Sequence, residues 1–494
     1  MSSASDISAF EHSVEPAPAE TLFRDKKWTY IQDSTSNTGQ YAGQIQFNLS
    51  TISSQAAFLN WEEAVLELPV KLQILNGGAG SVTSTAACTI DQLVPKAGAW
   101  QFIDSVQVVI DGTTVQTNQV HKNVNTTFKA ITETVYNTYV KHGPTSNFVL
   151  DKYATPTIQG SSGAAQSLEN LATSSFMTAT NSVGEQRKSS GCIETSSDVA
   201  PAGAVAAGSP FYVAHYLACI KLRYISDYFK KYPLQKNTRG FIYLNYNSSS
   251  TTLVTTGTAG VVAPATIASL SNNMNFGNTC PVPWNLSSGA TTTALAGGLA
   301  LPASAVTLTI TADINGTPTA GTGITPTQSF SRLLVPSYSP NPSADHALAQ
   351  KKTFRNFERI TNQFTVTPGA SFTWTVSNGI ANPKRLIMQP VITNPTAGAT
   401  VSDVINPFRS PFSTSGVDGG LDDVTSAGLL SQRQWESLYR FVAVDIGRRL
   451  PSEDGASKSI IVSGTSNCNY ALTIYYHVLR EVVASVDTAM GTVS

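Results

Sequence analysis

The stretch from Phe102 to Thr117 reads FIDSVQVVIDGTTVQT and is the clearest indication of fold class in the chain. Two runs that favour β-structure flank the dipeptide Asp111-Gly112. Asp-Gly is a strong signal for a two-residue hairpin, because both central residues of a type I′ turn need positive φ. The stretch therefore predicts two antiparallel strands joined by a tight turn.

The β pattern extends in both directions from this hairpin. Polar and apolar residues alternate in Gln44 to Leu49 (QIQFNL) and in Leu66 to Leu75 (LELPVKLQIL), as expected of strands with one buried face. Pro69 lies inside the second segment and favours an edge strand or a bulge there. Further strands are expected at residues 211–222, 241–246, 306–312, 364–366, 372–376, 385–389, 438–444, 459–462 and 471–478.

Two short segments carry a helical pattern instead. Between Val120 and Val135 the apolar residues are spaced four, four, three and four apart, which is the period of an amphipathic helix. Leu222 to Phe229 predicts a second, shorter helix. Because short strands and turns fill the rest of the chain, the predicted fold class is all-β, built of antiparallel sandwiches, with these helices bracing their ends.

The length of 494 residues predicts two large domains, because compact domains usually hold about 100 to 200 residues. Arg332 to Pro342 (RLLVPSYSPNP) contains three prolines and is predicted to be a stiff, extended connector. Near residue 250 lies an alternative boundary. The predicted parts are a flexible arm at 1–25, a first domain at 26–345 with loop-rich insertions at about 154–210 and 248–328, a second domain at 346–485 and a tail at 486–494.

The charged fraction is unusually small. Charged residues make up 13% of the chain, against about 25% in typical proteins, and the formal net charge is −1. A surface of hydroxyls and amides with so little net charge opposes self-association only weakly. It also argues against strong direct binding of nucleic acid, which requires clustered Lys and Arg.

The sequence contains no motif for common catalytic or metal chemistry. The six histidines and five cysteines show no HExxH or CxxC spacing, and neither GxSxG nor GxxxxGK[ST] occurs. We therefore expect no catalytic residues, no cofactor and no metal. Neither a secretory signal nor a membrane-spanning segment is predicted. Two rival classes stay open: a β-sandwich adhesin or lectin, and a β-sandwich glycosidase, whose two carboxylates need not be close in sequence.

Four parts of the chain resemble the double jelly-roll major capsid proteins of virophages, polinton-like viruses and their relatives in the adenovirus and membrane-containing phage lineage. These parts are FIDSVQVVIDGTTVQ at 102–116, KLRYISDYFKKYPLQKNTRGFIYLNYN at 221–247, RLLVPSYSPNP at 332–342 with VSNGIANPKRLIMQP at 376–390, and YRFVAVDIGRRLP at 439–451 followed by ALTIYYHVLRE. They resemble the family in order as well as in content. The long insertions have no counterpart in it.

The resemblance implies a structural protein of the virion with two jelly rolls per chain. It also implies homotrimers of hexagonal outline, which tile an icosahedral shell around double-stranded DNA inside a host cell. Penton and minor capsid proteins are expected partners, and an inner membrane an indirect one.

One charged cluster near the C-terminus suggests a subunit contact. Asp445, Arg448 and Arg449 lie within five residues of each other. Arg forms bidentate bonds to carboxylates and is common in interfaces. These residues are therefore candidates for an ion pair between subunits, with an exposed strand end as the equally weighted alternative.

Overall fold

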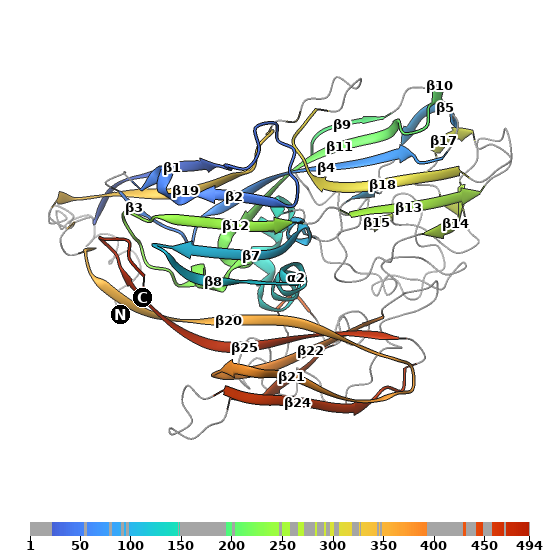
Figure 1. Cartoon of the computed structure of the whole chain (residues 1–494). Helices are drawn as coiled ribbons and strands as arrows, with labels where there is room; N and C mark the ends of the chain where they lie inside the picture. The colour runs from blue at the N-terminus through green and yellow to red at the C-terminus, as the bar shows by residue number, and fades with distance from the viewer. Residues whose placement is uncertain are drawn as a thin grey trace, which may run out of the picture.

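A computed structural model of the chain gives its fold. The prediction of an all-β protein is confirmed: antiparallel strands form two sandwiches (Figure 1). The structure describes residues 22–53, 57–78, 82–89, 93–94, 98–146, 148, 194–199, 203–246, 249–256, 265–270, 282–283, 291–292, 297–300, 306–318, 326, 328–342, 345, 348–392, 428–430, 441–447, 457–468 and 471–493.

The first sandwich has the strand order of a jelly roll. Its strands in chain order are β1 (Phe23–Gln32), β2 (Gln44–Asn48), β4 (Val65–Asn76), β7 (Ile103–Ile110), β8 (Thr113–Gln119), β11 (Pro210–Lys221), β12 (Gly240–Tyr246) and β19 (Arg332–Pro340). One sheet pairs β1, β19, β4 and β11 in that order, and the other pairs β2, β12, β7 and β8. Strands close in sequence therefore alternate between two sheets, as two interlocked Greek keys require.

The second sandwich repeats this order. Its strands are β20 (Lys351–Val366), β21 (Ser371–Ala381), β22 (Pro383–Ile392), β23 (Val442–Asp445), β24 (Ser457–Thr465) and β25 (Leu472–Asp487). One sheet runs β20, β25, β22, β23, and the other pairs β21 with β24. The first of these sheets matches all four strands of its counterpart, and the second matches the β2–β12 pair of its own. Most of the segment between β22 and β23 lies outside the described residues. The chain is a double jelly roll.

Further strands lie between those of the first jelly roll, several of them in the insertions at 154–210 and 248–328. They include β3 (Phe58–Leu59), β5 (Val82–Thr89), β6 (Leu93–Val94), β9 (Glu194–Val199), β10 (Gly203–Val205), β13 (Ser249–Thr256), β14 (Ala265–Leu270), β15 (Val282–Pro283), β16 (Thr291–Thr292), β17 (Gly297–Ala300) and β18 (Val306–Ile314). Strands β18, β13 and β14 extend the sheet beyond β4. The strand predicted at 306–312 is confirmed by β18, whereas β13 and β14 lie where the region 248–328 was predicted to be loop-rich. Their Thr and Val residues suit a pleated surface.

The hairpin and the first helix were predicted correctly. Asp111 and Gly112 join β7 to β8 with φ of 49° and 76°. The helix α2 (Lys122–Glu133) lies within the predicted range. The segment predicted as a helix at Leu222–Phe229 is divided between the short α5 (Leu222–Ile225) and a 3-10 turn, η5 (Asp227–Lys230). Among the residues that the structure describes, the other helical segments are η1 (Leu49–Ile52), η2 (Ala99–Phe102), α3 (Tyr136–His142) and η3 (Pro144–Ser146).

Two predictions based on proline are wrong. The supposed connector at 332–342 is largely β19, an inner strand between β1 and β4. On that side its pairing with β4 ends at Leu334 and its pairing with β3 begins at Ser337, so Pro336 falls between the two partners. Pro69 is not in an edge strand, because β4 has partners on both sides. On one side its partner changes from β19 at Glu67 to β18 at Val70, so Pro69 falls in a gap of the ladder, where a missing N–H is tolerated.

The described strands give bounds for the two domains. The first jelly roll runs from β1 to β19 and the second from β20 to β25. The first strand begins at Phe23, inside the segment assigned to the arm, and the last ends at Asp487. Among the described residues, no helix combines the length and apolar character needed to cross a lipid bilayer.

Candidate functional site

The two jelly rolls meet at an interface that we call the seam. It is formed by α2 and η5 of the first jelly roll and by β20, β25 and Phe441 of the second (Figure 1). Antiparallel pairing joins β20 to β25 over their whole length, from Lys351 opposite Asp487 to Val366 opposite Leu472. We call this pair of strands the ribbon.

The ribbon contributes to both hydrophobic cores. Val366 and Leu472, at one end, pack in the core of the second jelly roll. Ala484 and Val486, toward the other end, pack in the core of the first. One continuous ladder of the second jelly roll therefore reaches from its own core into the core of the first, and its side chains pack in both.

The apolar centre of the seam is Phe128 on α2. Its ring is stacked on the imidazole of His477, at 4.9 Å between centroids and 28° between planes. It also meets Phe441 edge to face at 5.1 Å. Phe128 is 1% exposed and Phe441 likewise 1%. Aromatic pairs at such distances stabilise a contact beyond simple area burial.

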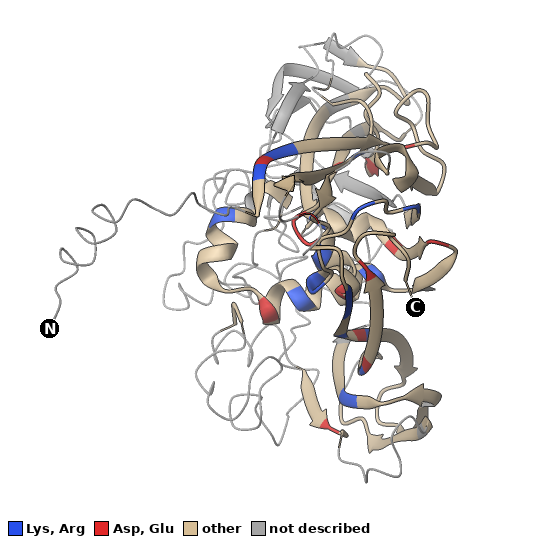
Figure 2. Ribbon diagram, turned by 90° about the vertical axis from the view of Figure 1, so that its left-hand side faces the viewer, with Lys and Arg blue, Asp and Glu red and all other residues tan. Residues whose placement is uncertain are grey.

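A chain of ion pairs runs beside these rings. Lys129 Nζ donates to Asp227 Oδ1 at 2.6 Å, with both side chains less than a tenth exposed. Lys230 Nζ donates to Glu133 Oε2 at 2.7 Å, and the other oxygen of Glu133 accepts from Arg359 on β20. The chain therefore crosses from the first jelly roll into the second. Figure 2 shows that charged residues are sparse on the ribbon diagram and that several gather at the middle of the molecule.

A second polar group of the seam is centred on Glu358 of β20. Its carboxylate accepts hydrogen bonds from Gln119 at 2.6 Å and from Gln116 at 3.2 Å, both on β8. Arg480 Nε on β25 donates to the same carboxylate at 2.6 Å. Asn125 on α2 donates to the main-chain oxygen of Arg359 at 3.0 Å. These bonds fix the orientation of one jelly roll relative to the other, since most need a specific side-chain geometry.

Burial and neighbouring charges act against each other in the seam. Burial opposes ionisation of Asp227, but Lys129, Lys230 and Lys122 outweigh it and lower the pKa of this carboxyl below its ordinary value. Burial lowers the pKa of Lys129 to about 8, although Asp227 opposes that effect. Burial, with a smaller contribution from Arg359, holds the pKa of His477 well below its ordinary value. At neutral pH the ion pairs are therefore formed while His477 is uncharged.

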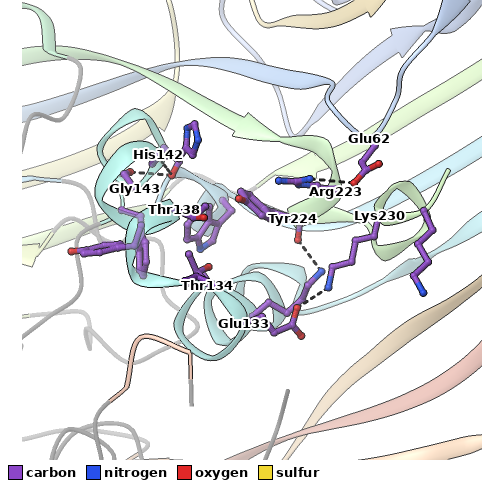
Figure 3. A pocket seen from close by; sticks show the side chains of 17 residues that line it. Glu62, Glu133, Thr134, Thr138, His142, Gly143, Arg223, Tyr224 and Lys230 are labelled. Carbon is purple, nitrogen blue, oxygen red and sulfur yellow. Dashed lines mark hydrogen bonds and ion pairs between the residues drawn. The ribbon is translucent and has the colours of Figure 1, made fainter. Parts of the chain in front are cut away.

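A pocket of about 410 Å³ opens beside the seam, between α2, α3 and α5 (Figure 3). Aromatic side chains, among them Trp100 and Tyr224, form part of its wall. Two ion pairs lie on its rim: Arg223 contacts Glu62 at 3.3 Å, and Lys230 contacts Glu133. Within the described part of the chain, no group of three His, Cys, Asp or Glu side chains is placed to hold a metal ion.

The candidate ion-pair residues are only partly described. Asp445 lies exposed at the end of β23, opposite Arg385 of β22, and its Oδ1 accepts from the Gly447 N–H at 2.8 Å. It lines a cleft of about 630 Å³ that also includes Glu481 and Lys384. Arg448 and Arg449 lie outside the described residues. The predicted cluster and the seam are thus separate features, although the cleft reaches both.

Sequence reasoning missed the charged residues of the seam. Glu133 and Arg359 are 226 residues apart in the chain, and Lys129 and Asp227 are 98 apart. One signal was present: in a chain so poor in charge, the helical segments around α2 and η5 carry several Lys and acidic residues. That signal marks the segments without revealing which residues pair.

Outward-facing side chains form a second candidate site. Trp28 and Tyr30 are two residues apart on β1, so they point to the same face of the strand, and they are 53% and 58% exposed. Cations lie over both rings: Lys26 Nζ is 5.6 Å from the centroid of Trp28, and the guanidinium of Arg332 is 5.8 Å from that of Tyr30. Large exposed aromatic residues supplemented by Arg are typical of protein interfaces.

Comparisons with known proteins found similarity in structure alone. No protein-family model and no curated protein matches the sequence. The mavirus major capsid protein is 12% identical, with 94% of this chain and 89% of that chain covered and a TM-score of 0.49. The Sputnik virophage structure is 11% identical, with coverage of 96% and 88% and a TM-score of 0.44. The Faustovirus major capsid protein is 10% identical, with coverage of 98% and 94% and a TM-score of 0.39.

Proposed function

We propose that this chain is a major capsid protein and that it functions in the virion by assembling with copies of itself. The observation that carries the proposal is the jelly-roll strand order, complete in the first sandwich and repeated by the described strands of the second, with the two joined in one chain through the ribbon and the seam. Jelly rolls are a common architecture of viral capsid subunits. The four segments that resemble capsid proteins support the same function.

The repeat of the fold supports a particular assembly. Three copies of a chain with two similar sandwiches present six similar walls around one axis. A cyclic trimer of this kind has a nearly hexagonal outline, and hexagonal units tile a surface. Closed cyclic symmetry is the usual form of homo-oligomers, and an obligate interface of this type buries roughly 2,000 Å² or more. The role is structural and requires no catalysis.

The surface suits contacts between copies. Charged residues are few, so long-range repulsion between subunits is weak. The exposed aromatic face of β1, with Trp28 and Tyr30, offers apolar area on an edge strand that is paired on one side by β19. We propose further contacts with penton and minor capsid proteins, an indirect association with an inner membrane, and no strong direct binding to the genome.

Sedimentation of the purified full-length chain tests the assembly. We expect a species with three times the mass of the chain, which persists on dilution because the interface is obligate. Replacement of both exposed aromatic residues, in Trp28→Ser/Tyr30→Ser, is expected to weaken the trimer without unfolding the subunit. A chain that sediments as a monomer at every concentration would refute the proposal.

We also propose that Asp445 forms an ion pair with Arg448 or Arg449 of a neighbouring copy. Its exposure at the end of β23 supports this role. We expect Asp445→Ala to lower the stability of the trimer, measured by its dissociation in sedimentation. The matched control is Asp345→Ala, because Asp345 is paired within the chain to Lys236. If the Asp445→Ala trimer dissociates no more readily than the unmodified one, the proposed ion pair is refuted.

A further inference from the structure

His477 occupies an unusual position in the seam. It lies on β25, is 0% exposed and stacks on Phe128 of α2. Its Nδ1 is 2.8 Å from the hydroxyl of Thr361 on β20. Its Nε2 is buried without a hydrogen-bond partner among the described residues. The ring therefore lies between the two jelly rolls, with no acceptor available for a second N–H.

The charges that face His477 are positive. Arg359 on β20 and His121 at the start of α2 both disfavour its protonation. The guanidinium of Arg359 also lies over the ring of Phe128, at 5.5 Å from its centroid. Lys122, the first residue of α2, is itself buried.

The carboxylates of the seam are already engaged. Glu133 accepts from Arg359 and Lys230, Asp227 pairs with Lys129, and Glu358 accepts from Arg480. A proton on His477 would place a buried positive charge beside Arg359, and no free acid among the described residues of the seam would neutralise it, which is strongly unfavourable.

We propose that the seam is an acid-sensitive latch, in which protonation of His477 separates α2 from the ribbon while the two jelly rolls keep their own folds. The latch is a property of the single chain and does not depend on assembly into a capsid. It converts a fall in pH into a loosening between the two halves of the subunit.

Proton linkage sets the direction in which pH changes the closure of the seam. The pKa of His477 is lower in the closed seam than its ordinary value of 6.5, so an open state in which the ring reaches water binds the proton more strongly. Closure is therefore fully stable above 6.5 and is lost as pH falls toward the depressed pKa. While the closed form does not titrate, the ratio of open to closed molecules rises about tenfold for each pH unit below 6.5.

Other groups of the seam act in the same direction. The pKa of His121 is lowered by burial, although Asp104 opposes this, so this residue adds to the response below 6.5. Burial opposes ionisation of Glu133, but Arg359, Lys129 and Lys230 outweigh it and lower its pKa below the ordinary 4.5. Glu133 and Asp227 therefore contribute only at lower pH. The first step of the response belongs to the histidines.

Hydrogen exchange of the purified full-length chain, followed by mass spectrometry from about pH 7 to pH 4.5, measures the latch. After correction for the intrinsic exchange rate, we expect the opening of α2 and of β20 residues 354–361 to increase about tenfold per pH unit below 6.5 for the proton on His477, and more steeply where His121 also takes up a proton. Peptides from β21 with β24, and from β2 with β12, should keep their protection. If α2 opens equally at every pH, the proposal is overturned.

Variants assign the response to His477. His477→Asn keeps a side-chain oxygen for the Thr361 hydroxyl but does not titrate. The logarithm of the open-to-closed ratio should therefore change with pH less steeply, by about one unit per pH unit, because one proton fewer is taken up on opening. The matched control is His215→Asn on β11, since His215 is also buried but lies in the first jelly roll, and its pKa is lowered to about 4 by burial and by Lys71. That variant should open as the unmodified chain does. An undiminished slope in His477→Asn would overturn the assignment, and if this variant does not fold, the same measurement on His477→Gln decides.

Discussion

The buried pair of Lys129 and Asp227 allows a quantitative test of the seam. The two side chains are 4% and 8% exposed and 2.6 Å apart. Asp227→Asn removes the negative charge and leaves the ammonium of Lys129 buried with no carboxylate at that position. Removal of one partner from a buried ion pair typically costs about 3–5 kcal/mol. We expect the free energy of unfolding to fall by that amount.

A double variant separates the effect of the lost charge from the effect of packing. In Lys129→Met/Asp227→Asn both charges are gone, and the double variant should recover most of the loss, because apolar replacement of a buried pair is often close to neutral. The assay is urea denaturation at pH 7, followed by circular dichroism. The exposed pair Lys26–Glu63, with side chains 44% and 43% exposed, is the control, and Glu63→Gln should change stability by less than about 1 kcal/mol. If Asp227→Asn costs no more than Glu63→Gln, the buried ion pair between α2 and η5, on the first jelly roll's side of the seam, does not stabilise the fold in the way described.

Two further predictions concern the first jelly roll. Burial raises the pKa of Asp313 on β18 from its ordinary 3.8 to about 6. The protonated carboxyl therefore stabilises the fold at a pH below 3.8, and this stabilisation is lost as pH rises through 6. Asp313→Asn should stabilise the chain at pH 7 by up to about 2 kcal/mol and leave its stability unchanged near pH 4, as measured by thermal melts at both pH values. Equal changes in melting temperature at pH 7 and near pH 4 would show that the effect does not come from the ionisation of Asp313. Gly240 begins β12 with φ of 142°, and a Cβ there would collide with the carbonyl of Val109 on the paired strand β7. Gly240→Ala should lower the melting temperature, with a loss of more than about 1 kcal/mol, whereas Gly369→Ala, at a turn with φ of 69° and open space around it, should cost less.

The strands were largely predictable from the sequence, whereas their partners were not. Alternation in Gln44 to Leu49 and the Asp111-Gly112 turn are local features, and the structure has β2 and the β7–β8 hairpin there. Pairing between β1 and β19 joins residues about 300 positions apart, and no local pattern encodes it. Prolines misled the interpretation of 332–342, because Pro336 and Pro340 lie where the ladder to β4 has already ended.

The seam was hidden from sequence reasoning for a related reason. The sequence places His477 in the strand predicted at 471–478 but does not show what its ring contacts. Its contact with Phe128 and the bond from Glu133 to Arg359 depend on how two domains pack. A lone histidine in a strand looks the same in sequence whether it faces a single core or an interface between domains. The Asp445 cluster stays a prediction, since two of its three residues lie outside the described parts of the chain.

Electron cryo-microscopy of the purified, full-length protein tests the central claim most directly. The claim is that two jelly rolls, joined by the ribbon and the seam, form a rigid subunit that assembles in threes. Class averages should show particles of hexagonal outline with six sandwich-shaped walls around a threefold axis. Single two-lobed particles that never associate, or rings with another number of copies, would contradict it.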